Sequence, residues 1–295
     1  MILNESKINV SDWLAENEKN FLPPVCNKLM HNEQLVVMFV GGPNQREDYH
    51  IEQGEELFYQ LKGDMCVKIV ENGQRRDVHI KEGEFFILPA RVPHSPQRTA
   101  NSIGLVIERR RLSNELDGVR WMVPDTTQPL YEKWFHCKDL GVELAPIIKA
   151  YFASDEYKTK QPNRNVMAKL PFELNNVVLS NREHGPYKLM EKLGESASRI
   201  NLTPTHMNLQ FSIVAFKRGE HVIVDELNSE NDVWFWQLNG SSKIERVDST
   251  SSTLFIELSK NESVYLSMKN VNQFRINVLD DDAILLQVMQ DSARA

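Results

Sequence analysis

Two histidines and a glutamate lie between Arg46 and His94, in a stretch whose sequence contains several turn-forming segments. His50 and Glu56 are six residues apart, and His94 follows a later turn that contains proline. Two imidazoles and one carboxylate form the ligand set that holds non-haem Fe(II) while leaving coordination positions open. The stretch therefore predicts a metal centre built from His50, Glu56 and His94, with one Fe(II) per chain.

Two arginines of the same stretch are spaced to join the ligands. Alternate residues of a strand share a face, so Arg46 would align with His50, and Arg98 with His94. A guanidinium group binds a carboxylate through two parallel N–H donors. Arg98 is therefore a candidate for holding the carboxylate of a substrate next to the metal.

The elements that must position these residues are predicted to be short strands. We expect them at residues 35–40, 56–61, 65–70, 76–80, 84–88 and 102–109. Residues 62–64 and 71–73 are predicted to form hairpin turns, the second with the Asn-Gly pair that favours type I′. Residues 5–20 and 128–155 have helical patterns. Short strands at this spacing indicate an antiparallel barrel or a double-sheet roll.

A second strand-rich block, from about residue 172 to residue 290, repeats part of the first. Residues 55–63 align with 232–240, and residues 83–94 align with 261–272. In this register the positions of His50, Glu56 and His94 are occupied by Leu227, Val233 and Asn272. These side chains cannot hold iron, so the second copy is predicted to bind no metal.

We expect the boundaries to be residues 1–160 for a catalytic domain, 161–177 for a polar linker and 178–295 for the second domain. The aromatic strand at 234–236 is too apolar to be left in water. We therefore expect the second domain to bury it and to cover the first domain, in place of a second subunit.

The motifs around the ligands resemble those of the cupins. The matching residues are His50, Glu56 and Gly63 of the first cupin signature, and Gly83, Pro89 and His94 of the second. Glu52 stands where a second histidine is usual, while Arg91 and Arg98 replace a glycine and an asparagine. The resemblance implies an all-β-dominated fold of two jelly-roll cupin barrels in tandem with a few flanking helices, and a metal site with three protein ligands.

Five segments carry a closer resemblance, namely residues 46–50, 54–60, 93–98, 108–111 and 130–140. They are similar to the 3-hydroxyanthranilate 3,4-dioxygenase family in its animal, two-cupin form. The resemblance implies a cytosolic monomer that uses Fe(II) and O2 to open the ring of 3-hydroxyanthranilate. The implied product is 2-amino-3-carboxymuconate semialdehyde, on the kynurenine route from tryptophan to quinolinate and NAD.

This chemistry assigns expected roles to several residues. Glu108 would accept the proton of the substrate hydroxyl or bind the amino group, and Arg98 would bind the carboxylate. Arg46 would assist at the carboxylate or stabilise negative charge that develops on O2. Glu56 would lie beside the substrate as well as the metal, and Asn27, after a Pro-Pro turn, would line the mouth of the site.

Each role has a structural alternative. Glu108 would then be a solvated strand end, Arg46 would pair with a neighbouring carboxylate at the surface, and Arg98 would form a structural salt bridge. The run 109–111 is predicted to be solvated rather than a phosphate site. Two other functions also stay open, namely a cupin dioxygenase for another aromatic acid, and a bicupin that binds ligands without catalysis.

Composition limits the remaining classes of partner. The net charge of −7 argues against nucleic acid, and no apolar run is long enough to span a membrane. The N-terminus has no signal-peptide pattern. Three scattered cysteines match neither a disulfide framework nor a zinc motif, which favours the cytosol.

Overall fold

The computed structural model describes residues 7–22, 26–44, 46–138, 140–163, 169–176, 179, 185–194, 197–204, 208–223, 231–248, 253–269, 271–291 and 293. These residues fold into two compact units. The first unit takes its described residues from 21–27 and 39–187, and the second from 1–20, 28–38 and 188–295. Strands dominate both units and the helices are few, which confirms the predicted fold class.

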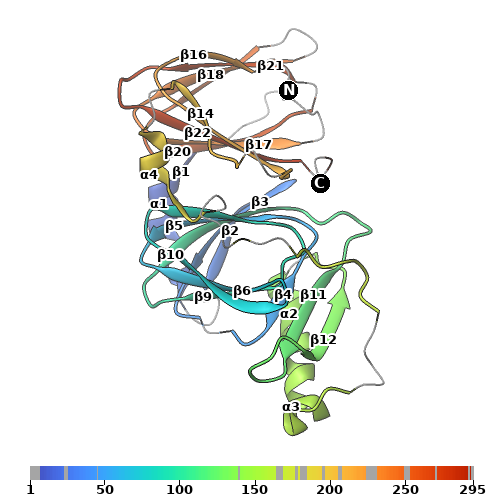
Figure 1. The fold of residues 1–295 in the computed structure, drawn as a ribbon. Helices are drawn as coiled ribbons and strands as arrows, with labels where there is room; N and C mark the ends of the chain where they lie inside the picture. Colours follow the sequence, from blue (N-terminus) through green and yellow to red (C-terminus); the bar gives the residue numbers. More distant parts are fainter. Residues whose placement is uncertain are drawn as a thin grey trace. The chain divides into compact units, whose positions relative to one another are not determined.

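Two antiparallel sheets carry His50, Glu56 and His94, and we call these two sheets the first roll (Figure 1). One has the order β13-β8-β5-β10-β3-β2, formed by Tyr187–Lys188, Glu84–Leu88, Glu56–Lys62, Ile103–Arg109, Leu35–Gly41 and Asn27–Asn32. The other has the order β12-β11-β4-β9-β6-β7, formed by Pro129–Phe135, Asp117–Met122, Tyr49–Ile51, His94–Arg98, Met65–Glu71 and Gln74–Ile80. Strands β8-β5-β10-β3 and β4-β9-β6-β7 have the order of a jelly roll, in which two sheets rather than one closed barrel enclose the core.

The predicted strands of this roll are confirmed, because each has the alternating or continuous apolar pattern of a buried strand. The Asn72-Gly73 hairpin is confirmed as well, since both residues have the positive φ angles that a type I′ turn requires, 47° and 74°. The turn at 62–64 is not a hairpin, however. Strands β5 and β6 belong to different sheets, so this turn carries the chain across the roll.

The predicted helix over 128–155 is only partly correct. Residues Pro129–Phe135 form strand β12, which pairs with β11, and helix α2 begins at Leu140 and ends at Ala153. The apolar spacing in 129–135 suits a strand and a helix equally well, and the long-range pairing with β11 decides between them. Helix α2 and helix α3 (Asp155–Thr159) then pack their aromatic residues on Val119, Trp121 and Leu130.

The N-terminal helical prediction is also shortened by the structure. Strand β1 (Ile8–Asn9) precedes helix α1 (Val10–Glu16), and a 3-10 turn follows at Glu18–Phe21. The Asn9 side chain accepts a hydrogen bond from the backbone of Asp12, which caps the helix. None of the described helices is long and apolar enough to cross a membrane.

The second unit repeats the jelly-roll order with its own two sheets. One has the order β1-β20-β17-β22-β15-β14, whose further strands are Glu262–Ser267, Asp232–Asn239, Ile284–Gln290, Phe211–Phe216 and Arg199–Asn201. The other has the order β16-β21-β18-β19, formed by Gly219–Ile223, Val271–Val278, Ser242–Asp248 and Thr253–Leu258. A short helix α4 (Leu189–Leu193) precedes them.

Equivalent hydrogen bonds confirm the duplicated register around the aromatic strand. The side-chain amides of Gln60 and Gln237 each donate to the backbone carbonyl oxygen two residues later. The backbone carbonyl oxygens of the same two residues accept hydrogen bonds from the N–H groups of Gly83 and Asn261. Phe58 pairs with Phe86 in the first unit, and Phe235 pairs with Val264 at the matching place in the second. As predicted, residues 234–236 are buried.

Candidate metal centre

The three predicted ligands come from both sheets of the first roll. His50 on β4 and His94 on β9 are directly opposed residues of antiparallel strands, whereas Glu56 begins β5 in the other sheet. All three are buried, with exposed fractions of 3%, 2% and 6%. The closure of the roll, rather than proximity along the chain, therefore brings the carboxylate to the imidazoles.

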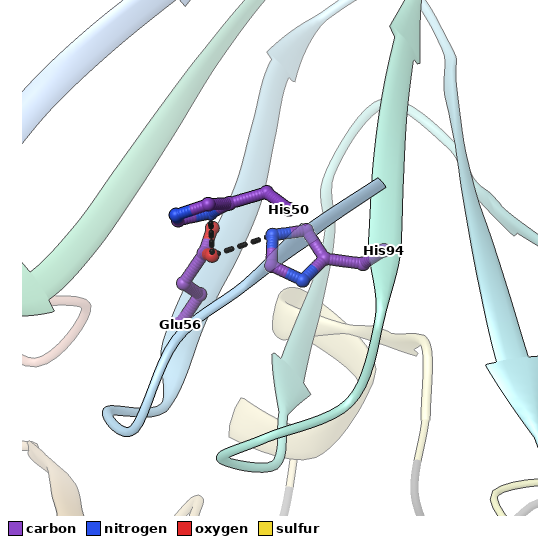
Figure 2. A group of neighbouring side chains, drawn as sticks. All are labelled: His50, Glu56 and His94. Carbon is purple, nitrogen blue, oxygen red and sulfur yellow. Dashed lines mark ion pairs between the residues drawn. The ribbon is translucent and has the colours of Figure 1, made fainter. Parts of the chain in front are cut away.

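Figure 2 shows the Glu56 carboxylate pointing at both imidazole rings. Its Oε1 atom lies 2.7 Å from Nε2 of His94 and 3.8 Å from Nδ1 of His50. One donor atom from each residue can be chosen so that all lie within 4.8 Å of one another. The three side chains are thus close enough to direct their donor atoms at a single ion.

The donor set fits a divalent transition metal. Oε1 of Glu56 is fully buried, and its orientation towards the two rings does not meet the geometry of a hydrogen bond. A buried carboxylate oxygen without a hydrogen bond costs free energy unless a cation satisfies it. Two imidazoles and a carboxylate are the ligands that such an ion prefers.

The charges around Glu56 favour the ionised form of its carboxyl group. Burial alone would raise the pKa of its carboxyl group, but the imidazoles of His94 and His50 hold that pKa well below its usual value. For His50, burial opposes the charged form, yet Asp117 and Glu56 raise its pKa to about 9. A metal that binds here must displace this imidazole proton, as is general for histidine ligands.

Asp117 is a partner of His50 that the sequence did not reveal. Its Oδ2 atom lies 2.7 Å from Nε2 of His50, and its side chain is fully buried on β11. The pairing of Val119 with His50 places it there, although 67 residues separate Asp117 from His50. A carboxylate on the far nitrogen of a ligating histidine fixes the ring and strengthens it as a ligand.

Arg111 links this carboxylate to the other acidic groups of the site. Its guanidinium group lies 3.0 Å from Asp117 Oδ2, 2.5 Å from Glu52 Oε2 and 2.5 Å from Glu108 Oε1. Burial opposes its charge, but the three carboxylates raise the pKa of Arg111 well above its usual value. The prediction of a solvated run at 109–111 is therefore wrong for Arg111, and also for Arg109, which is buried in an ion pair with Glu115.

Glu108 is buried on β10 and is not a solvated strand end. Burial raises the pKa of Glu108, Arg111 opposes the rise, and Glu56 adds to it. A carboxylate with a raised pKa is a stronger base than an ordinary surface glutamate. Its position suits proton transfer beside the metal ligands, because carboxylate oxygens of Glu52, Glu56 and Glu108 lie within 4.8 Å of one another.

Glu52 occupies the place of the missing cupin histidine. It is buried, and burial together with Glu108 and Glu56 raises its pKa well above the usual value in spite of Arg111. Glu56, in contrast, has a strongly lowered pKa. The two carboxyl groups are thus shifted in opposite directions, and the lowered pKa of Glu56 favours its ionised form, which is the form that a metal binds.

Arg98 presents a buried cation on the strand of His94. His94, Pro96 and Arg98 are alternate residues of β9 and all three are buried. They therefore lie on one face of the strand. The Nε atom of Arg98 is buried without a hydrogen-bond partner among the described residues. Burial lowers the pKa of Arg98 to about 10, Glu56 opposes this, and Arg46 contributes to it. An unpartnered donor of this kind suits an anionic ligand.

Arg46 and Asn27 lie at less enclosed positions. The guanidinium group of Arg46 is about one-fifth exposed and forms an ion pair with Asp48, as the structural alternative expected. Its backbone N–H donates a hydrogen bond to Oε1 of Gln97, and its backbone carbonyl oxygen accepts one from Nε2 of Gln97. Asn27 is exposed at the start of β2. Their roles towards a substrate remain predictions.

The second unit has apolar side chains where the first has ligands. His94 pairs with the fifth residue of β6, and Phe274 pairs with the fifth residue of β18. Ile223 pairs with Phe274 as His50 pairs with His94. The position of His94 thus belongs to Phe274 and not to Asn272, because the connection before β21 shifts the register by two residues. Leu227 and the side chain of Asn272 lie outside the described residues.

The apolar set Ile223, Val233 and Phe274 belongs to one buried core. These side chains offer no nitrogen or oxygen to an ion. Among the residues that the structure describes, the groups able to hold a metal all lie in the first unit. That the second copy binds no metal stays a prediction, which the apolar side chains at these positions support.

A jelly roll that directs two histidines and a glutamate to one buried point defines the cupin class. Residues 2–152 match the sequence model of 3-hydroxyanthranilic acid dioxygenase. The chain is 46% identical to 3-hydroxyanthranilate 3,4-dioxygenase of Xenopus tropicalis, with 96% of this chain and 98% of that protein covered. It is 52% identical to the enzyme of the same name from Mus musculus, with 81% and 83% covered. The chain therefore belongs to the 3-hydroxyanthranilate 3,4-dioxygenase family.

Among solved structures, oxalate decarboxylase of Bacillus subtilis aligns with 90% of this chain and 71% of its own, with a TM-score of 0.48 and 16% identity.

Replacement of Asp117 by asparagine is expected to weaken metal binding by about 10- to 100-fold, the usual effect of removing the partner of a ligating histidine. The amide keeps the shape of the side chain but loses the charge that fixes the ring of His50. Metal titration of the purified protein measures the effect. The Asp232→Asn variant, which alters a carboxylate bound to Tyr265 in the second unit, should bind as wild type does. Unchanged affinity in Asp117→Asn would restrict Asp117 to balancing the charge of Arg111.

Proposed function

We propose that the protein is an Fe(II)-dependent, ring-opening dioxygenase that converts 3-hydroxyanthranilate and O2 to 2-amino-3-carboxymuconate semialdehyde. This reaction lies on the kynurenine route from tryptophan to quinolinate and NAD. The observation that carries the proposal is the convergence of His50, Glu56 and His94 with a buried base, Glu108, and a buried guanidinium group, Arg98. The membership of the dioxygenase family supports the same substrate.

His50, Glu56 and His94 would hold one Fe(II) per chain, which would supply the redox chemistry that O2 requires and positions for the substrate heteroatoms. The apolar counterparts in the second unit support a single iron of this kind. Asp117 would keep the His50 ring in place.

Glu108 accepts the proton of the substrate hydroxyl group in this proposal. Its raised pKa makes it a competent base, while the ion pair with Arg111 keeps its carboxylate in one orientation. The same carboxylate can accept a hydrogen bond from the substrate amino group. Arg46 lies within electrostatic reach of Arg98, and we assign to it either help at the substrate carboxylate or stabilisation of negative charge developing on O2. Asn27 would lie at the mouth of the site.

The decisive experiment is addition of Fe(II) to the protein without oxygen, followed by 3-hydroxyanthranilate and O2. Growth of the absorbance of the ring-opened product, with one O2 consumed per substrate, supports the proposal. An iron-loaded protein that binds the compound without turnover would be a bicupin binding protein. Turnover of another aromatic acid in preference would indicate a dioxygenase of different specificity.

We also propose that the protein is a cytosolic monomer. All three cysteines are free, which suits a reducing compartment. Sedimentation at working concentration tests whether the protein is a monomer, and an obligate dimer would contradict this proposal.

Replacement of Arg98 by alanine is expected to keep the metal but lose productive substrate binding. Removal of one side of a buried charged pair costs about 2–5 kcal/mol, which corresponds to roughly 30-fold or more in affinity. Substrate titration under anaerobic conditions measures the loss. The matched ligand is 2-aminophenol, which lacks the carboxylate and should be little affected. Equal losses for both ligands would mean that Arg98 acts through the structure of the site.

A further inference from the structure

A second group of side chains of the types that bind metals lies on the face of the β6–β7 hairpin that points away from the core. Cys66 is directly opposite His79, and Lys68 is opposite Asp77. Because side chains alternate along a strand, these four residues project from one face while Met65, Val67 and Val78 point into the core. One donor atom from each of Cys66, Asp77 and His79 can be chosen so that all lie within 4.8 Å of one another.

These three side chains are available to a ligand. Asp77 and His79 are exposed and Cys66 is half-buried. In the part of the chain that the structure describes, none of the three forms a hydrogen bond or an ion pair through its side chain. Elsewhere on the hairpin, by contrast, Arg76 forms an ion pair with Glu71 at 3.1 Å. The thiol, the carboxylate and the imidazole thus converge without being used by the fold.

We propose that Cys66, Asp77 and His79 form a second metal site, separate from the dioxygenase centre, which takes a borderline-soft divalent ion such as Zn2+ or Co2+. Thiolate, imidazole and carboxylate are the three protein ligands that zinc uses. Three such ligands leave a fourth, tetrahedral position open to water or to another donor. The antiparallel pairing of β6 and β7 places Cys66 directly opposite His79 and holds Asp77 two residues away on the same face.

The same three residue types would also suit a cysteine nucleophile activated by a histidine. A nucleophile of that kind has a lowered thiol pKa. Here burial and the neighbouring Asp77 raise the pKa of Cys66, and Lys68 only partly opposes them. Metal binding would form one sulfur–metal bond and release one H+ from the thiol. The raised thiol pKa therefore favours a metal site over a nucleophile.

The two metal sites differ in one property that a simple experiment detects. The dioxygenase centre has nitrogen and oxygen ligands only, whereas the second site has a sulfur ligand. Co2+ bound to a thiolate gives an intense sulfur-to-cobalt charge-transfer band in the near ultraviolet, and Co2+ bound to imidazole and carboxylate does not. Titration of the full-length protein with Co2+ under reducing conditions therefore reports the second site separately.

We expect wild-type protein to develop this band and to bind two Co2+ per chain. The Cys66→Ser variant should lose the band and bind one Co2+, while the Cys137→Ser variant, which alters a buried thiol, should behave as wild type. Conversely, His94→Ala should keep the band, because the sulfur site does not depend on the dioxygenase centre. Absence of the band in wild type, or its persistence in Cys66→Ser, would overturn the proposal.

A second measurement tests the other two ligands. Bound Zn2+ should slow alkylation of Cys66 by iodoacetamide at least several-fold, as followed by mass spectrometry of the modified peptide. The His79→Ala and Asp77→Asn variants replace exposed residues, so both should fold normally and lose most of this protection. Lys68→Ala serves as the matched control on the same face and should keep it. Full protection in both ligand variants would exclude the three-residue site.

Discussion

Replacement of His94 by alanine is expected to leave a folded protein that holds almost no iron and has no measurable turnover. Glu56 and His50 would remain, and two ligands do not fix the open three-ligand geometry. Loss of a partner behind a ligand already weakens binding by about 10- to 100-fold, so loss of the ligand itself should exceed that range. Iron analysis after gel filtration, together with circular dichroism, measures both parts.

The matched control is His221→Ala. His221 is also a buried histidine, but it lies in the second unit with its Nε2 atom 2.9 Å from the carbonyl oxygen of Lys217. This variant should retain wild-type iron content. Wild-type iron in His94→Ala, or an equal loss in both variants, would refute the assignment of His94 as a ligand.

The Glu108→Gln variant is expected to bind iron and substrate but to turn over about 10²–10⁴-fold more slowly, the usual contribution of a positioned general base. The amide has almost the shape of the carboxylate but cannot accept a proton at neutral pH. Arg111 keeps Glu52 and Asp117 as partners, so its position should change little. Steady-state kinetics and iron analysis separate the two effects.

The Glu108→Asp variant provides the control for this test, since it restores a carboxylate on a shorter side chain. It should recover part of the lost turnover, whereas a residue needed only for charge balance would show similar rates with Asp and with Gln. Near-normal turnover of Glu108→Gln would remove Glu108 from the mechanism and leave it as a partner of Arg111.

The sequence predicted the local features of this protein well. Neighbouring residues determine these features. The strands at 56–61 and 84–88 follow from short apolar segments, and the Asn72-Gly73 hairpin follows from a turn that needs positive φ angles. The choice of His50, Glu56 and His94 also came from residue types and spacing, and the structure brings these three side chains together. The duplication of the aromatic strand could be recognised because both copies keep the same pattern of residue types.

The tertiary structure decided what depends on residues far apart in the chain. Asp117 reaches His50 only because β11 pairs with β4, and no spacing in the sequence indicates that pairing. Pairing of β11 with β12 likewise made a strand of residues whose apolar pattern also fits a helix.

Burial was the second property that the sequence could not supply. Arg111 belongs to a run of charges that normally faces water. It is buried because three carboxylate groups surround it, one of which, Glu52, lies far away in the sequence. Phe274 rather than Asn272 takes the place of His94 in the second unit because the segment 261–274 is two residues longer than the equivalent segment 83–94. The three side chains that meet at the candidate metal centre could thus be predicted from the sequence. The residues that surround them depend on how the two sheets of the roll come together.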